Sequence, residues 1–318
     1  MKANVHLTNK ELLNVRELIK KRKKTKKISQ KIERLIPFLL LCIAAVSVFT
    51  TIGIILTLLT ETVNFFRVIP IWDFLTGTVL KPLNKVPEYG VLPLIAGTVI
   101  STVIAMIVAA PIGLMTAIYL SEYASKKVSQ IVKPILEVLA GIPSIVYGFF
   151  AFTFVTPLLR EFIPGLEAAN ILSPGIVMGI MIIPMIASLS EDAMNSVPNA
   201  MREGALALGS TKLEVTKNVV IPAALSGIIA SFVLGISRAL GETMIVTIAS
   251  GSTKNFSFDV TQSMQTMTAY IVEVTSGDAA SGSTIYYSLY AVAMILFIFT
   301  LVMNMLARYV SRKFREEY

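Results

Sequence analysis

Residues 35–59, LIPFLLLCIAAVSVFTTIGIILTLL, form an apolar run of 25 residues that contains no charged side chain. A helix needs about 20 apolar residues to cross the hydrocarbon core of a bilayer. The run follows a basic segment, as the apolar part of a signal peptide does, but it is longer than that part and no clear small-x-small cleavage site follows it. The sequence therefore predicts an uncleaved membrane helix here.

The same apolar character recurs along the chain. The composition is 54% hydrophobic and only 15% charged, whereas a soluble domain carries about 25% charged residues. The segments long enough to span a membrane are 35–59, 92–120, 135–159, 176–194, 223–249 and 285–307. We expect an all-α, polytopic membrane protein with about six transmembrane helices.

The distribution of basic residues orients these helices. Six crossings leave both termini on one side of the membrane, and cytoplasmic segments carry the excess of Lys and Arg. With cytoplasmic termini, the inner segments hold 22 basic residues and the outer segments hold 5. We therefore expect both termini in the cytoplasm, and we do not interpret the net charge of +8 as a sign of nucleic-acid binding.

This topology divides the chain into four parts. Residues 1–34 form a basic cytoplasmic arm, and 35–91 hold the first transmembrane helix and an extracytoplasmic loop. Residues 92–308 form the main transmembrane domain with a cytoplasmic loop at 196–222, and 309–318 form a basic cytoplasmic tail. The Lys-rich arm is typical of an orientation signal that also contacts anionic lipid, with a specific partner as the alternative.

The sequence offers no motif for covalent chemistry. It contains no P-loop, no plausible Ser/His/Asp trio and no metal-ligand cluster. We expect a chain that is not an enzyme and that binds neither a metal nor a cofactor of its own.

The loop at 196–222, SVPNAMREGALALGSTKLEVTKNVVIP, is predicted to be helical. Pro198 suits a helix start and Gly209 suits the position just after a helix end. An apolar stripe of Met201, Ala205 and Leu208 falls on one side of this helix. Because we expect nothing else in the chain to cover the stripe, the loop indicates a partner with a groove. Thr211 and Glu214 have the spacing of a capping box for a second helix.

The same loop resembles the loop signature of ABC-importer permeases, E-A-A-x3-G-x9-I-x-L-P. Val219 and Ile221 replace the signature Ile and Leu, and glycine replaces the middle alanine, with the spacing intact. In that family the loop forms the coupling helix, which docks into a cleft of a cytoplasmic ATPase. The resemblance implies that ATPase coupling involves Glu203, Gly204, Ala205, Gly209 and Pro222.

Four further stretches resemble the permeases of phosphate importers, in particular their C-type subunit. They are APIGLMTAIYLSEYA (110–124), GIPSIVYGFFA (141–151), SRALGETMIVTIASG (237–251) and MTAYI (267–271). RALGET is shared by both permease subunits of these systems, so the C-type assignment depends mainly on the last seventy residues.

The resemblance implies the permease fold and a multi-pass subunit of a bacterial or archaeal plasma membrane that translocates inorganic phosphate. It also implies the partners, which are an A-type permease subunit, two copies of a cytoplasmic ATPase that binds ATP and Mg²⁺, and an extracytoplasmic phosphate-binding protein.

Two charged residues interrupt the predicted fifth span. On a continuous helix, Arg238 and Glu242 share one face with the small residues Gly227, Ser231 and Gly235. Small residues at this spacing let helices approach closely.

Arg238 lies 16 residues beyond the proline that ends the cytoplasmic loop, or about 24 Å along a helix. An ionised Arg facing lipid at this depth costs at least about 2.5–3.5 kcal/mol, so Arg238 must face protein or water. Its planar fork suits a phosphate oxyanion, and we expect it on the substrate pathway. Glu242 would hold the guanidinium and replace phosphate as its counter-ion. The alternative is an ion pair that only pins helices together.

Other functions remain open at this point. The chain could serve a different oxyanion such as molybdate or sulfate, against which the RALGET match counts. It could be an ion-coupled secondary transporter, for which we see neither a repeated half nor a use for the ATPase-docking loop. A membrane scaffold or sensor would leave Arg238 unexplained.

The topology predicts which engineered cysteines react from outside the cell. In a Cys42→Ser background, Ser276→Cys and Ser281→Cys should react with an impermeant thiol reagent in intact cells, because both lie in an outer loop. Ser311→Cys should react only after permeabilisation. Labelling of Ser311→Cys in intact cells would overturn the orientation.

Overall fold

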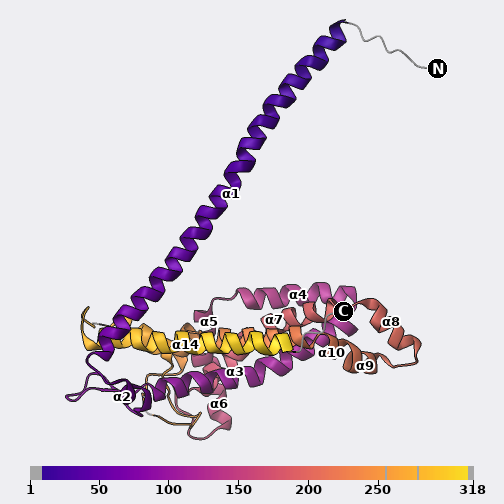
Figure 1. The fold of residues 1–318 in the computed structure, drawn as a ribbon. Coiled ribbons are helices and arrows are strands. Elements are labelled where there is room, and N and C mark those ends of the chain that lie inside the picture. Colours follow the sequence, from indigo (N-terminus) through magenta and orange to yellow (C-terminus); the bar gives the residue numbers. More distant parts are fainter. Residues whose placement is uncertain (1–8, 255, 278, 314–318) are drawn as a thin grey trace. The chain divides into compact units, whose positions relative to one another are not determined.

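The structure is a computed structural model that describes residues 9–254, 256–277 and 279–313 (Figure 1). It has two units, Met1–Thr57 and Leu58–Tyr318.

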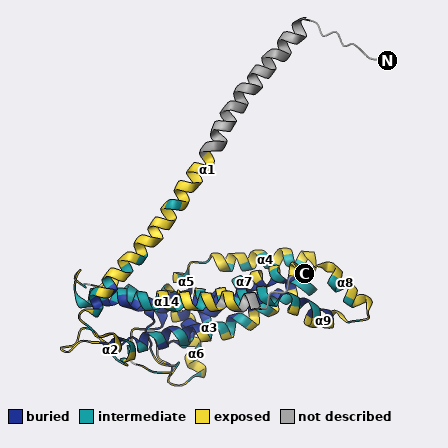
Figure 2. Cartoon of the chain, in the orientation of Figure 1, coloured by how far each residue is buried: buried dark blue, intermediate teal, exposed yellow. Residues whose placement is uncertain are grey.

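The first long helix, α1, covers Asn9–Phe66, and its segment Ile36–Phe66 is long and apolar enough to cross a membrane. Its apolar side chains are exposed over most of this length, as the yellow ribbon in Figure 2 shows. Such a surface is suited to hydrocarbon. The prediction of a first membrane helix is confirmed, although the helix continues beyond residue 59.

Two helices form the centre of the second unit. These are α3 (Leu92–Ile118) and α7 (Leu172–Asn195), and α11 (Leu225–Leu240) packs against both. Their contact is close because small residues line it. A Cβ added at Gly179 would lie 2.7 Å from the carbonyl oxygen of Ala105. The core around this contact consists of buried Ala, Val, Met and Ile side chains and one buried Tyr.

A second core lies at the opposite end of the unit from α8 and α9 (Figure 1). Phe65 and Phe74 are fully buried there against Tyr270 and other apolar residues. The elements around it are α2 (Ile71–Thr76), the antiparallel pair β1 (Leu80–Lys81) and β2 (Glu88–Tyr89), α13 (Met267–Ser276) and α14 (Thr284–Lys313).

Short helices complete the unit. They are α4 (Lys126–Gly141), α5 (Ser144–Phe150), α6 (Thr156–Phe162), α8 (Asn199–Ala207), α9 (Lys212–Val215), α10 (Ile221–Ala223) and α12 (Met244–Ala249). Three π-helical turns join neighbouring helices at Tyr119–Tyr123, Ala151–Val155 and Thr216–Val220.

The predicted span 135–159 is wrong as one continuous helix. α4 ends at Gly141, and the backbone is extended at Ile142 and Pro143 before α5 begins. The cause is Pro143, which disfavours a helical conformation of the residue before it. The membrane-spanning segment is instead Ser144–Phe162, and α4 is a separate helix in front of it.

The predicted span 223–249 is also wrong as one helix. α11 ends at Leu240, and α12 starts only at Met244. At its other end, Lys212–Ala223 and Leu225–Leu240 form a pair bent by 69°. Within the described ranges, five helices are long and apolar enough to cross a membrane, and there are six if this bent pair counts as one broken span. The all-α membrane fold with about six spans is confirmed.

The close contact between α3 and α7 predicts a penalty for any side chain at Gly179. We expect Gly179→Val to destabilise the protein by about 1–3 kcal/mol, because its methyl groups overlap the α3 backbone. The measurement is the thermal unfolding midpoint in detergent. Gly53→Val on α1 is the matched control, since no atom lies within 4 Å of the Cβ position there. Equal midpoints for the two variants would contradict this packing.

Candidate functional site

A groove of about 530 Å³ opens between α4, α7 and the end of α11. Its polar lining comes from Lys133 and Glu137 on α4, Ser188 and Glu191 on α7, and Arg238 on α11. The remaining lining is apolar and includes methionines and a proline of α7. We call this cavity the α4–α7 groove. It combines an apolar wall with a few charged groups, which is the usual composition of a small-molecule site.

Arg238 lies in the last turn of α11 and is exposed in the isolated chain. Its Nη2 lies 3.9 Å from the sulfur of Met181, which is a weak acceptor. The ion pairs recorded among described residues involve other side chains, so the guanidinium has no carboxylate partner there. The Arg238 fork therefore faces the groove with most of its donors uncommitted.

Glu242 does not hold Arg238 as expected. Its carboxylate oxygen Oε1 accepts hydrogen bonds from the backbone N–H groups of Met244 (3.1 Å) and Ile245 (3.4 Å), at the start of α12. Because α11 ends at Leu240, the four-residue spacing no longer places the two charged side chains on one helical face. The structure thus locates both residues at one helix break but does not bring their charges together.

Sequence reasoning missed an ion pair at the other polar end of the groove. Lys133 Nζ lies 2.8 Å from Glu191 Oε1, and the Glu191 side chain is only 6% exposed. Asn195 Nδ2 donates to the same oxygen at 3.2 Å. One signal was present, because Glu191 is a carboxylate inside the predicted apolar span 176–194. Its partner lay on a different helix, which spacing alone does not indicate.

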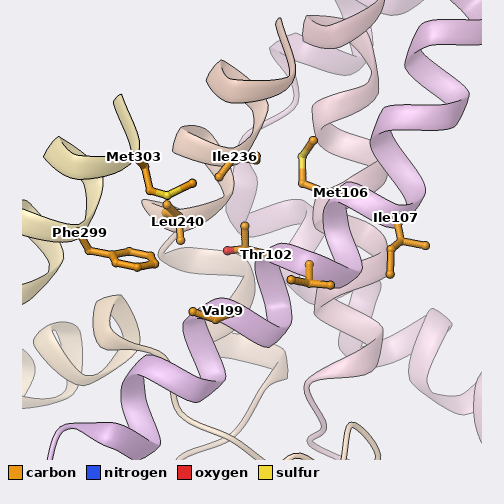
Figure 3. A pocket seen from close by; sticks show the side chains of 9 residues that line it. Val99, Thr102, Met106, Ile107, Ile236, Leu240, Phe299 and Met303 are labelled. Atoms are coloured by element: carbon orange, nitrogen blue, oxygen red, sulfur yellow. The ribbon is translucent and has the colours of Figure 1, made fainter. Parts of the chain in front are cut away.

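A second cavity, of about 410 Å³, lies between α3, α11 and α14 (Figure 3). Thr102 is its one polar lining residue, and Met106, Leu240 and Phe299 are among the apolar ones. A cavity of this composition suits hydrocarbon rather than an anion. Of these two cavities, the α4–α7 groove is the one with charged groups for a polar solute.

The loop at 196–222 has the predicted local structure. α8 starts after Pro198 and ends before Gly209, whose φ of +90° is in the left-handed region that favours glycine. Thr211 and Glu214 form the predicted capping box at the start of α9. Glu203 and Gly204 are exposed on α8, Ala205 is half-buried, and Pro222 is exposed on α10.

The expectation that the stripe of Met201, Ala205 and Leu208 lies uncovered is wrong for its first two members. Met201 and Ala205 pack against a buried cluster formed by residues of α3, α7, α9 and α11 and of the segments between them. The exposed apolar residues are instead Leu206, Leu208 and Leu213, with 49%, 89% and 67% of their surface accessible. We call these three residues the leucine face. The loop folds back on its own chain, so a different side remains for a partner.

A second residue that sequence reasoning missed fastens α8 in this position. The Arg202 guanidinium donates to Glu122 through Nε (3.2 Å) and Nη2 (3.0 Å). It also donates to the carbonyl oxygens of Val197 (2.6 Å) and Met194 (2.7 Å) and to Asn199 Oδ1 (3.3 Å). The ion pair is largely buried, with 16% and 7% of the two side chains exposed.

Comparison with known proteins identifies relatives that match most of this chain. Residues 109–316 match the family described as binding-protein-dependent transport system inner membrane component. The chain is 31% identical over 241 residues to the probable ABC transporter permease protein YqgH of Bacillus subtilis, which covers 76% of this chain and 78% of that protein. It is 34% identical over 258 residues to the phosphate transport system permease protein PstC of Mesorhizobium japonicum, covering 75% and 77%.

A solved structure has the same fold. It is a bacterial alginate ABC transporter in complex with an alginate pentasaccharide-bound periplasmic protein, and its matching chain has a TM-score of 0.60. The match covers 92% of this chain and 96% of the other, at 15% sequence identity. At this identity the likeness concerns the fold alone.

The positive φ at Gly209 predicts a difference between two glycines of the loop. Gly209→Val should loosen the end of α8, because an L-residue in the left-handed region costs about 1–3 kcal/mol. Gly204→Ala is the matched control and should tighten α8, because alanine is favoured over glycine in a helix by about 1 kcal/mol. Amide hydrogen exchange over 203–215 is the measurement. Equal protection in the two variants would contradict this geometry.

Proposed function

The chain belongs to the family of binding-protein-dependent transport system inner membrane components, and from that membership we propose that it is the transmembrane permease subunit of an ATP-binding-cassette importer for inorganic phosphate. The proposal of phosphate is supported by the likeness to PstC of Mesorhizobium japonicum over three quarters of the chain. It is supported independently by the chemistry of the α4–α7 groove.

The observation that carries this proposal is Arg238. A guanidinium presents a planar fork that matches two oxygens of a phosphate, and it stays charged at any physiological pH. Arg238 lines a groove of about 530 Å³ and has no carboxylate partner among the described residues. A phosphate ion in the groove can therefore take the place of water on this guanidinium. Glu242 contributes by accepting hydrogen bonds from the first N–H groups of α12, beside the break that follows α11.

The energy for transport comes from a partner in this proposal. The leucine face projects from α8 and α9 and suits an apolar cleft on a cytoplasmic ATPase. Two copies of that ATPase bind ATP and Mg²⁺, and this chain performs no covalent step. Its role is to convert movement of α8, the coupling helix, into alternating access of the groove.

The remaining partners complete the transporter. A second permease subunit, of the A-type, faces this chain across the pathway, and an extracytoplasmic phosphate-binding protein delivers the anion from outside. Both termini of this chain lie in the cytoplasm, on the side of the ATPase. This placement follows from the excess of basic residues in the segments assigned to that side.

Substitution of Arg238 tests the phosphate proposal. In proteoliposomes that hold the complete transporter, Arg238→Gln should lower phosphate uptake at least about tenfold, because a hydrogen bond to a charged group contributes about 1.5–3 kcal/mol. Arg238→Lys keeps the charge but loses the fork, and it should give intermediate uptake. The measurement is the initial rate of radiolabelled phosphate uptake per reconstituted complex.

Arg160→Gln provides the matched control, since Arg160 is an exposed arginine on α6 outside the groove. It should transport at the parent rate. Parent-like phosphate uptake by Arg238→Gln, at equal assembly with the ATPase, would contradict a pathway role for Arg238.

A further inference from the structure

The contacts of Arg202 use every donor that this side chain has. A guanidinium carries five N–H groups, and the five hydrogen bonds of Arg202 go to Glu122, Asn199 and two backbone carbonyl groups at the end of α7. No donor remains for a ligand or a lipid headgroup. Arg202 therefore acts within the chain, as a clamp between α8, the end of α7 and the π-helical turn that follows α3.

The burial of this ion pair makes the clamp stiff. Breaking one side of a buried ion pair is costly, because the other charge stays buried without a partner. Both backbone acceptors of Arg202 also lie at the point where the chain leaves α7 and enters α8. A displacement of α8 away from the end of α7 and from the π-helical turn would break the hydrogen bonds of Arg202 to Met194 and Glu122 at once. The two helices are thus expected to move together.

A continuous series of polar contacts leads from this clamp to the α4–α7 groove. Ser121, the neighbour of Glu122, donates to Asn195 Oδ1 at 2.9 Å. Asn195 in turn donates to Glu191 Oε1 at 3.2 Å, and the same oxygen lies 2.8 Å from Lys133 Nζ. Glu191 and Lys133 line the groove. The series joins the loop that contains α8 to α4. No residue of α4 is buried.

We propose that Arg202 is the positioning residue that transmits movement of the coupling helix to the groove. The ATPase moves α8, the Arg202–Glu122 clamp moves the end of α7 with it, and the pair of Glu191 with Lys133 carries the movement to α4. The groove then changes its exposure at its Lys133 end. This inference rests on the proposed function, because it requires an ATPase that acts on α8.

A clamp that transmits movement and a clamp that only holds the fold together differ in what their loss would do. If the clamp only holds the fold together, its loss should weaken assembly and transport in equal proportion. If it transmits movement, its loss should leave an assembled complex that hydrolyses ATP without changing the groove. Spatial continuity of contacts does not separate these cases, so the test must measure the response of the groove to ATP.

The experiment reports the groove without using phosphate. In a Cys42→Ser background, Ser188→Cys places a thiol on an exposed position of the groove lining. Its reaction rate with a soluble maleimide is measured in the purified transporter, without nucleotide and after trapping with ATP and orthovanadate. We expect the two rates to differ at least about fivefold, which is the lower range of coupling between distant sites.

The clamp is then removed in two ways in the same background. Arg202→Met leaves Glu122 unpaired, whereas Arg202→Met with Glu122→Gln leaves no lone buried charge. We expect both variants to bind the ATPase and hydrolyse ATP, and we expect the ratio of the two labelling rates to fall close to one. Arg202→Lys keeps one charged contact and should give an intermediate ratio. Lys127→Met, which removes an exposed charge from the first turn of α4, should keep the parent ratio.

Each remaining outcome contradicts a defined part of this account. A parent-like ratio in the double variant would overturn the transmission role of Arg202 and leave the proposed function intact. Loss of ATPase binding by the double variant would also overturn it, because Arg202 would then be a folding or docking residue. A parent transporter whose groove labelling does not respond to ATP would overturn both this inference and the ATP-driven function on which it rests.

Discussion

An ionised guanidinium in contact with hydrocarbon costs at least about 2.5–3.5 kcal/mol, and this cost decides which face of α11 can carry Arg238. The residue must face water or another polar group, so α11 turns this face toward the α4–α7 groove while the small residues before it pack on α7. A Cβ placed on Gly235 would lie within 3.5 Å of the Ile182 and Ile186 side chains. The hydroxyl groups of Ser231 and Ser190 form a hydrogen bond of 2.7 Å. Arg238 thus faces the polar groove, and the small residues before it let α11 pack closely against α7.

A second charged residue fixes the end of these helices that lies next to α8. Arg202 and Glu122 are charged groups that the fold buries, and the burial is tolerable because every donor of the guanidinium has an acceptor. This arrangement covers Met201 and Ala205 and leaves the leucine face exposed. A helix that is held by its own chain on one side and is apolar on the other can be displaced by a partner that binds its apolar side. In the proposed coupling, this arrangement links the leucine face to the groove through the contacts of Arg202 and Glu191.

The sequence predicted those features that depend on local chemistry. The apolar runs identified the membrane helices, and Gly209 marked the end of α8 because only its backbone adopts a positive φ at low cost. The capping box of Thr211 and Glu214 is also confirmed, because it depends on hydrogen bonds between residues that are close in sequence. The helix breaks were missed, although Pro143 and Gly241 were visible, because apolar character alone does not distinguish a continuous span from two short helices.

The spacing of residues along the sequence does not predict contacts between distant segments. Lys133 and Glu191 are far apart in sequence, and Arg202 and Glu122 are farther still, so their pairing appears only when the helices are packed. The expected contact between Arg238 and Glu242 is not formed, although the two residues are close in sequence. Their spacing is correct for a helix, but the helix ends between them.

In the proposed transporter, ATP drives phosphate, and not another solute, through this chain and its partners. The most direct measurement is uptake of radiolabelled phosphate into proteoliposomes that contain the two permease subunits and the ATPase, with the binding protein outside and ATP or no nucleotide inside. The account predicts accumulation that requires ATP, persists when the proton and sodium gradients are collapsed, and is not reduced by excess sulfate or molybdate. Uptake that needs an ion gradient instead of ATP, or transport of sulfate or molybdate in preference to phosphate, would contradict it.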